Sequence, residues 1–172
     1  MYRGTVNLHG IKEMQITFNR HEMLICELFG SIRRKNAMQF NNDRQVSQQD
    51  PYDMDIDGFM GEYAVAKYLN VMVDTTINEK KNPIDLIWNQ KTIDVKSTRN
   101  PTGNIYVTEY HRKKPCDLYI QVIIDGDTAN ITGWIDSLTL FDKAQLVTNN
   151  ARTSYTLFQK DLYPIEMLYV SQ

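Results

Sequence analysis

The chain has 172 residues, of which 42% are hydrophobic, and its 19 basic and 21 acidic side chains give a formal net charge of −2. This length and composition predict one ordinary domain and exclude a disordered chain. No apolar run approaches the roughly 18–20 residues of a membrane-spanning helix, and the N-terminus lacks the apolar stretch of a secretion signal. We therefore expect a cytoplasmic protein with no membrane partner. The near-neutral charge argues against coating of nucleic acid by bulk charge, but it allows one local basic surface.

We expect a single domain over residues 1–172, with residues 1–50 forming an N-terminal helical extension packed on it. Weak alternation over residues 1–18 predicts a short hairpin. Asn19 is the expected N-cap of a helix over 20–40, whose basic end at residues 33–35 is expected to be solvated. A polar loop is expected over 41–53, and then a helix over 57–69 that ends at Asn70. Apolar side chains at helical spacing predict the buried stripe of the first helix, namely Leu24, Ile25, Leu28, Phe29 and Ile32.

Beyond residue 70 the pattern changes to short β-rich runs separated by turn residues. Helices followed by several strands predict an α/β fold in which helices cover a mixed sheet. Cys26 and Cys116 lack any metal-ligand spacing and are expected to be buried as small apolar side chains. The expected strands cover 71–73, 84–88, 92–98, 104–110, 117–124, 129–135 and 155–159, with a helix over 136–146.

The most informative segment, residues 82–98, predicts a β-hairpin with Asn89-Gln90 at its turn. In that register Asp85 lies opposite Asp94, and Lys96 shares their face of the sheet. The opposite face is expected to bury the four apolar side chains of the hairpin, Leu86, Trp88, Ile93 and Val95.

Opposed carboxylates destabilise a sheet unless a cation neutralises them, and carboxylate oxygens are ligands that Mg²⁺ or Mn²⁺ prefers. Lys96 then lies where it could orient or deprotonate a water molecule beside the metal. The alternative is an ordinary solvated hairpin edge, in which Lys96 pairs with Asp85 or Asp94. Glu62, in the preceding helix, follows Gly61, which would allow another backbone or a substrate to approach closely.

These residues resemble the PD-(D/E)xK nuclease superfamily. Glu62 lies in a Gly-Glu-containing helix, Pro83-Ile84-Asp85 stands for the loose PD element, and Asp94-Val95-Lys96 stands for (D/E)xK. Pro83 is one residue further from its aspartate than in the strict motif. The resemblance covers about residues 58–98, and the strands expected after residue 114 look like later core strands of such nucleases.

The resemblance implies a restriction-endonuclease-like fold, a mixed β-sheet flanked by helices. It also implies a Mg²⁺- or Mn²⁺-dependent deoxyribonuclease, endonuclease or exonuclease, that leaves 5′-phosphate and 3′-hydroxyl ends. Asp85 and Asp94 would coordinate the metal, assisted by Glu62 and the Val95 carbonyl, and Lys96 would be the catalytic lysine. The small size favours a phage-type enzyme by analogy, which would act in the host cytoplasm.

Local charge agrees with DNA as the partner, because residues 91–114 contain six basic and two acidic side chains. His111 is assigned no catalytic role. A homodimer would suit the cleavage of two strands. The expected nucleic-acid-binding residues are Arg99, Arg112, Lys113 and Lys114.

Other functions fit parts of the sequence. A nuclease-like scaffold without activity would bind nucleic acid or protein. Residues 53–58 copy the first half of a calcium-binding EF-hand loop, although Ala64 occupies the position of its bidentate glutamate. Asp117 and Gln121 share a strand face, where they either line the site or support the fold.

Overall fold

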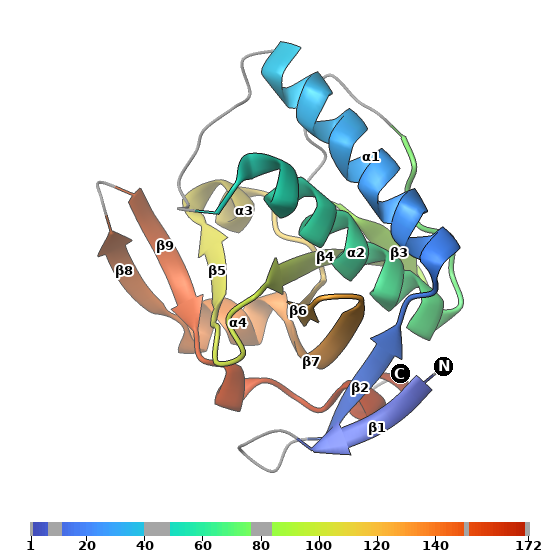
Figure 1. Ribbon diagram of the computed structural model, residues 1–172. Helices are drawn as coiled ribbons and strands as arrows, with labels where there is room; N and C mark the ends of the chain where they lie inside the picture. The colour runs from blue at the N-terminus through green and yellow to red at the C-terminus, as the bar shows by residue number, and fades with distance from the viewer. Residues whose placement is uncertain (1, 7–11, 40–48, 77–83, 150–151, 171–172) are drawn as a thin grey trace.

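The computed structural model of the chain describes residues 2–6, 12–39, 49–76, 84–149 and 152–170. Helix α2 packs on the larger of two sheets, α1 lies beside α2, and the smaller sheet lies to one side of the larger one (Figure 1). In the described part of the chain, no helix is long and apolar enough to span a membrane. The elements in chain order are β1 (Tyr2–Val6), β2 (Lys12–Thr17), α1 (Arg20–Gln39), α2 (Pro51–Leu69), β3 (Leu86–Trp88), β4 (Lys91–Thr98), β5 (Ile105–Thr108), α3 (Glu109–Lys113), β6 (Leu118–Asp125), β7 (Thr128–Asp136), α4 (Ser137–Lys143), β8 (Gln145–Asn149), β9 (Arg152–Leu157), and the 3₁₀ turns η1 (Gln159–Asp161) and η2 (Ile165–Tyr169).

The larger sheet has six strands in the order β1-β2-β7-β6-β4-β3. Strand β4 runs parallel to β6, and all other neighbours in this sheet are antiparallel. A second antiparallel sheet has the order β5-β9-β8. The predicted α/β class, with helices covering a mixed sheet, is therefore confirmed.

Two hydrophobic clusters cover the two faces of the larger sheet. Phe59 and Val65 of α2 belong to the cluster that contains Ile93 and Val95 of β4. The second cluster joins Tyr119 of β6 to the smaller sheet and α4, and its other main members are Ile105, Val107, Ile135, Leu140, Tyr155 and Leu157. Side chains of adjacent residues in β6 thus enter opposite cores, as strand geometry requires.

The N-terminal elements follow the sequence closely. Strands β1 and β2 form the predicted hairpin, and β2 pairs with β7. Asn19 caps α1, since its Oδ1 accepts the backbone N–H groups of His21 at 2.9 Å and Glu22 at 3.0 Å. Asn70 ends α2 in the left-handed conformation, with a φ of 54°. The described residues before position 40 therefore contact both the larger sheet and α2, and the domain boundary itself stays a prediction.

The predicted buried stripe of α1 is wrong. Leu24 and Leu28 are 53% and 56% exposed, and Ile25 is exposed as well. The interior face instead carries Cys26, Gly30 and Arg34. Small groups are needed there because α2 lies very close: a Cβ atom on Gly30 would stand 2.6 Å from the Cα atom of Ile56. Of the other predicted stripe residues, Phe29 packs partly against the core and Ile32 is half-buried.

Helix α2 begins six residues earlier than predicted, because Asp50 caps it and Pro51 occupies its first turn. Residues 53–58 are consequently helical, which removes the calcium-loop alternative.

Residues 71–73 form no strand. Residues 109–113 form α3 instead of extending a strand, and residues 145–149 form β8, paired with β9, instead of continuing a helix. Of the loop predicted over 41–53, residues 51–53 are helical and residues 41–48 lie outside the described residues, as do residues 82–83.

Two helical glycines give a matched test of the α1–α2 packing. Alanine is a better helix former than glycine by roughly 0.5–1 kcal/mol, but a Cβ atom on Gly30 would overlap Ile56, whereas one on Gly58 would meet nothing within 4 Å. We expect Gly30→Ala to lower the free energy of unfolding by about 1–3 kcal/mol. Gly58→Ala should leave it unchanged or raise it. Urea denaturation of both variants checks this, and equal effects at the two positions would contradict the packing.

Candidate functional site

The β3–β4 hairpin has the predicted register, with Leu86 paired to Ile93 and Trp88 paired to Lys91. Asn89 and Gln90 form its turn with φ values of 47° and 63°. The four apolar side chains of the hairpin are buried in one cluster, on the face covered by α2, as predicted: Leu86, Trp88, Ile93 and Val95.

Asp85 leaves this register. Its N–H donates to the Ile93 carbonyl at 2.9 Å, although Ile93 already pairs with Leu86. Its carboxylate Oδ2 accepts the Val95 N–H at 2.7 Å. The predicted direct opposition of Asp85 and Asp94 is therefore wrong, because the Asp85 side chain lies at the edge of β4 and replaces the backbone partner that β3 no longer supplies there.

Asp94 points to the other face of the sheet, where it is 3% exposed. Its Oδ1 lies 2.7 Å from the Lys96 ammonium nitrogen, and its Oδ2 lies 3.5 Å from His111 Nε2. The Thr108 hydroxyl contacts His111 Nδ1 at 2.8 Å. Asp94 Oδ2 is buried and accepts no hydrogen bond from the described residues. The sequence offered no sign of the His111 contact beyond the polar and basic run 110–114.

Helix α2 brings Glu62 to the site through the close approach predicted for Gly61. A Cβ atom on Gly61 would overlap Ser97 Oγ and lie 3.4 Å from Val95 Cγ1, so a larger residue there would require Ser97 to move. The Glu62 carboxylate is buried, and it accepts two hydrogen bonds from Arg33 of α1, at 2.6 and 2.7 Å. Arg33 was expected at a solvated helix end, and that expectation is wrong.

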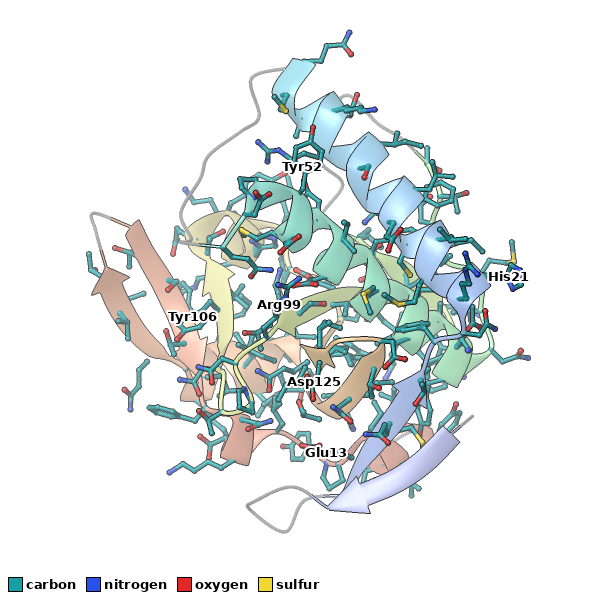
Figure 2. All side chains as sticks on the ribbon, in the orientation of Figure 1. Glu13, His21, Tyr52, Arg99, Tyr106 and Asp125 are labelled. Atoms are coloured by element: carbon teal, nitrogen blue, oxygen red, sulfur yellow. The ribbon has the colours of Figure 1, made fainter. Side chains whose placement is uncertain are left out.

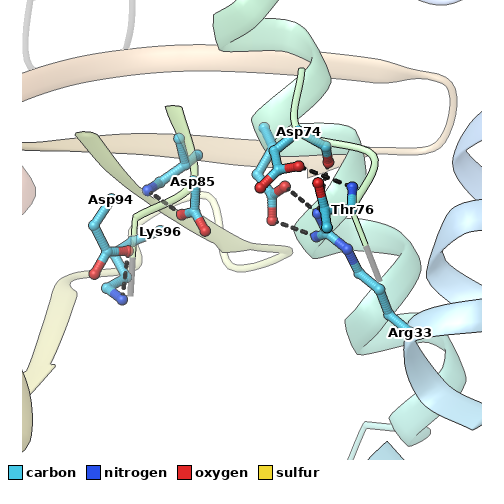
Figure 3. A network of polar contacts seen from close by, with 8 residues as sticks. Arg33, Asp74, Thr76, Asp85, Asp94 and Lys96 are labelled. Atoms are coloured by element: carbon cyan, nitrogen blue, oxygen red, sulfur yellow. Dashed lines mark hydrogen bonds and ion pairs between the residues drawn. The ribbon is translucent and has the colours of Figure 1, made fainter. Parts of the chain in front are cut away.

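Asp85 lies between these two ion pairs (Figure 3). Burial raises its pKa well above the usual value, and the charges of Glu62 and Asp94 raise it further, against the opposing effects of the Val95 N–H and Lys96. Burial opposes the charge on Arg33, but its hydrogen bonds to Glu62 and the charges of Glu62 and Asp85 leave its pKa above the ordinary value. The three carboxylates therefore act on one another electrostatically.

The site combines features for and against a metal ion. In the described parts of the chain, no three His, Cys, Asp or Glu side chains are arranged to hold one, and Arg33 engages both oxygens of Glu62. Asp94 Oδ2 accepts no hydrogen bond from these residues, and the pKa of Asp85 is raised by burial and by the negative charges of Glu62 and Asp94. The donor chemistry of Asp85 and Asp94 therefore fits a divalent cation, while Glu62 would first have to release Arg33.

Family models, curated proteins and solved structures were all compared with the chain. None matches it. The geometry and chemistry of the residues around Asp85 are therefore the basis on which a function can be assigned.

The basic residues predicted to bind nucleic acid differ in their surroundings. Arg99, near the end of β4 (Figure 2), contacts two acidic residues of α2, Asp57 at 2.6 Å and Asp53 at 3.1 Å. Arg112 donates to the Tyr155 hydroxyl and lies over its ring. Lys113 and Lys114 are exposed. The two lysines are consequently the more available for contact with a phosphate backbone.

Asp117 and Gln121 support the fold. The Asp117 carboxylate accepts the backbone N–H and the hydroxyl of Thr92, both at 2.7 Å. Gln121 is buried, donates to the Gly103 carbonyl at 2.7 Å and accepts from the Thr132 hydroxyl at 3.1 Å. These contacts fix the start of β4 and the turn before β5. Cys26 and Cys116 are buried, as predicted.

The raised pKa of Asp85 predicts how the stability of the fold depends on pH. The folded protein holds the Asp85 proton more tightly than the unfolded chain, whose carboxyl titrates near 3.8, so the free energy of unfolding falls as the pH rises above that value. Asp85→Asn removes the cost of ionising this carboxyl in the folded protein, and the asparagine side chain can still accept the Val95 N–H. In metal-free buffer we expect the variant to resist urea better than the wild type at pH 7.5, with the difference vanishing near pH 4.

Asp117→Asn is a control for which we expect the opposite change in stability. Hydrogen bonds from Thr92 lower the pKa of Asp117, so its carboxylate stabilises the fold at neutral pH and loses this effect only as the pH falls below about 4. This variant should be less stable than the wild type at pH 7.5. The raised pKa of Asp85 would be contradicted if Asp85→Asn were less stable than the wild type at pH 7.5 and the difference in the free energy of unfolding did not change toward pH 4.

Proposed function

We propose that the chain is a divalent-metal-dependent nuclease that hydrolyses DNA phosphodiester bonds to leave 5′-phosphate and 3′-hydroxyl ends. The observation that carries this proposal is the grouping around Asp85, whose carboxylate accepts the Val95 N–H at 2.7 Å next to the Asp94–Lys96 ion pair, and whose pKa is raised by burial and by the charges of Glu62 and Asp94. A fold gains no stability from such crowding, and perturbed carboxylates beside a lysine are typical of catalytic sites. Action in the cytoplasm, or the host cytoplasm for a phage protein, belongs to the same proposal.

Each residue has a defined task in this proposal. Asp85 and Asp94 would hold Mg²⁺ or Mn²⁺, which when bound supplies a Lewis acid and lowers the pKa of a coordinated water. Lys96, 25% exposed and 2.7 Å from Asp94, would orient the attacking water and stabilise negative charge at phosphorus. Coordination by Glu62 and by the Val95 carbonyl stays a prediction.

The restriction-endonuclease-like fold is part of the same proposal. Support comes from the order of the parts: a helix bearing Glu62, then a hairpin bearing Asp85 and Asp94-Val95-Lys96, then β6 parallel to β4. The PD-(D/E)xK resemblance concerns these same residues. A homodimer stays a prediction.

A scaffold that binds nucleic acid or protein without cutting is the second candidate. The contacts of Glu62 favour this candidate, because both oxygens of the Glu62 carboxylate already accept hydrogen bonds from Arg33. Such a scaffold would bind DNA equally well after Lys96→Ala and would cleave nothing in Mg²⁺ or Mn²⁺.

Cleavage of labelled linear, circular, flapped and four-way DNA in Mg²⁺ or Mn²⁺ tests the enzymatic proposal. We expect Asp94→Asn and Lys96→Ala each to reduce the rate by roughly 10²–10⁴-fold, because metal binding and water activation are lost. Circular dichroism should show both variants folded.

Two control variants match this test. Lys91→Ala removes a lysine from the start of the same strand, and Asp125→Asn removes an exposed aspartate from the β6–β7 turn. Both should cut at the wild-type rate. The role assigned to Asp94 or Lys96 is wrong if the corresponding variant retains full activity.

Metal binding can be measured without cleavage. Binding at a hundred times the Kd adds about 2.7 kcal/mol to the free energy of unfolding, which corresponds to a rise in Tm of roughly 5–10 °C at this chain length. We expect that rise for the wild type and for Asp125→Asn. Asp85→Asn and Asp94→Asn should lose most of it. An equal shift in all four proteins would place the cation elsewhere.

A further inference from the structure

Arg33 of α1 lies at the site although it comes from the N-terminal part of the chain, which the nuclease resemblance does not cover. Its guanidinium is held from three directions. Glu62 accepts two of its N–H groups, the Asp74 carbonyl accepts another at 3.2 Å, and the Phe59 ring lies 4.9 Å away. Asp74 is itself anchored, because its side chain accepts the Thr76 N–H at 2.8 Å. The orientation of the guanidinium is therefore fixed before any ligand binds.

The fixed guanidinium keeps binding capacity. Arginine has five N–H donors in a planar fork, and contacts with described residues account for three of them. The Arg33 side chain is 27% exposed, so it is not sealed from solvent. Its charge acts on Asp85, as does that of Lys96. Two cations, Arg33 and Lys96, thus stand on either side of the central carboxylate (Figure 3).

We propose that Arg33 binds a phosphate group of the nucleic-acid substrate, positioned by Glu62 and the Asp74 carbonyl; this inference rests on the nuclease function proposed above. Guanidinium N–H groups form strong, charge-assisted hydrogen bonds with phosphate, and Glu62 and Asp74 leave the Nε–H and one Nη1–H of Arg33 for this contact. Orientation by a buried carboxylate reduces the entropy lost on binding. Helix α1 then completes the substrate site, and the main task of Glu62 is to position Arg33. The phosphate is either an internal phosphodiester or the 5′-terminal phosphate of a strand.

The salt dependence of binding separates this role from a structural ion pair. Each phosphate contact contributes about one unit to the slope of log K against log salt concentration. Fluorescence anisotropy of a labelled oligonucleotide in EDTA, from 50 to 200 mM salt, measures that slope without cleavage. We expect Arg33→Gln to reduce the slope by about one unit and to weaken binding severalfold at low salt.

Three further variants complete the experiment. The double variant Arg33→Gln with Glu62→Gln removes the pair without leaving a buried carboxylate alone, so it guards against misfolding and should repeat the reduced slope. Glu62→Gln keeps the arginine charge and should keep the slope, while the loss of the positioning carboxylate should weaken binding. Arg20→Gln removes an exposed arginine from the same helix, thirteen residues and roughly 20 Å away, and should bind as the wild type does.

The outcomes are distinct. An unchanged slope in folded Arg33→Gln or in the double variant overturns the proposal and leaves Arg33 as a structural counter-ion of Glu62. A wild type that binds no oligonucleotide overturns the nuclease function and this role with it. Repeating the titration with 5′-phosphorylated and 5′-hydroxyl strands identifies the source: a loss in Arg33→Gln confined to the phosphorylated strand indicates a terminal phosphate, and an equal loss indicates an internal one.

Discussion

The site depends on a carboxylate that completes a sheet edge. Strand β3 begins only at Leu86, whereas its antiparallel partner β4 continues past Ile93 to Thr98, so the Val95 N–H has no backbone acceptor on that side. Asp85 supplies the acceptor with its side chain. An unpaired buried N–H would cost the fold free energy, and this need holds the Asp85 carboxylate near Glu62 and Asp94 despite their mutual repulsion. One local hydrogen-bonding requirement thereby concentrates negative charge at a single place.

Two cations and a histidine from three elements surround that charge. Lys96 comes from the same strand as Asp94, Arg33 comes from α1, and the His111 ring of the short helix α3 lies 3.5 Å from Asp94. Interior ion pairs of this kind add little net stability because desolvation offsets their attraction. In the function proposed above, their arrangement around one carboxylate would prepare the site for a charged ligand. A divalent cation and a phosphate together would replace contacts that the protein now makes with itself.

The parts of the site that are close in sequence were predictable. Alternation over residues 84–98 and the Asn89-Gln90 turn determine the hairpin register, because a two-residue turn leaves no other pairing of its strands. Side chains on the two faces of β4 follow from the same period. The departure at Asp85 was not predictable, since it arises where a strand ends and a side chain takes over from the backbone.

Sequence alone determined the α/β class, the hairpin, the burial of its apolar face and the close approach at Gly61, because each follows from local geometry or from the size of a side chain. Tertiary structure alone decided which face of α1 is buried and which cations reach the carboxylates. Helical spacing predicted one apolar face, and the close contact of Gly30 with Ile56 shows that a different face packs against α2. The Arg33–Glu62 pair joins two helices across 29 positions, a contact set by their packing angle and distance, which no pattern along either helix encodes.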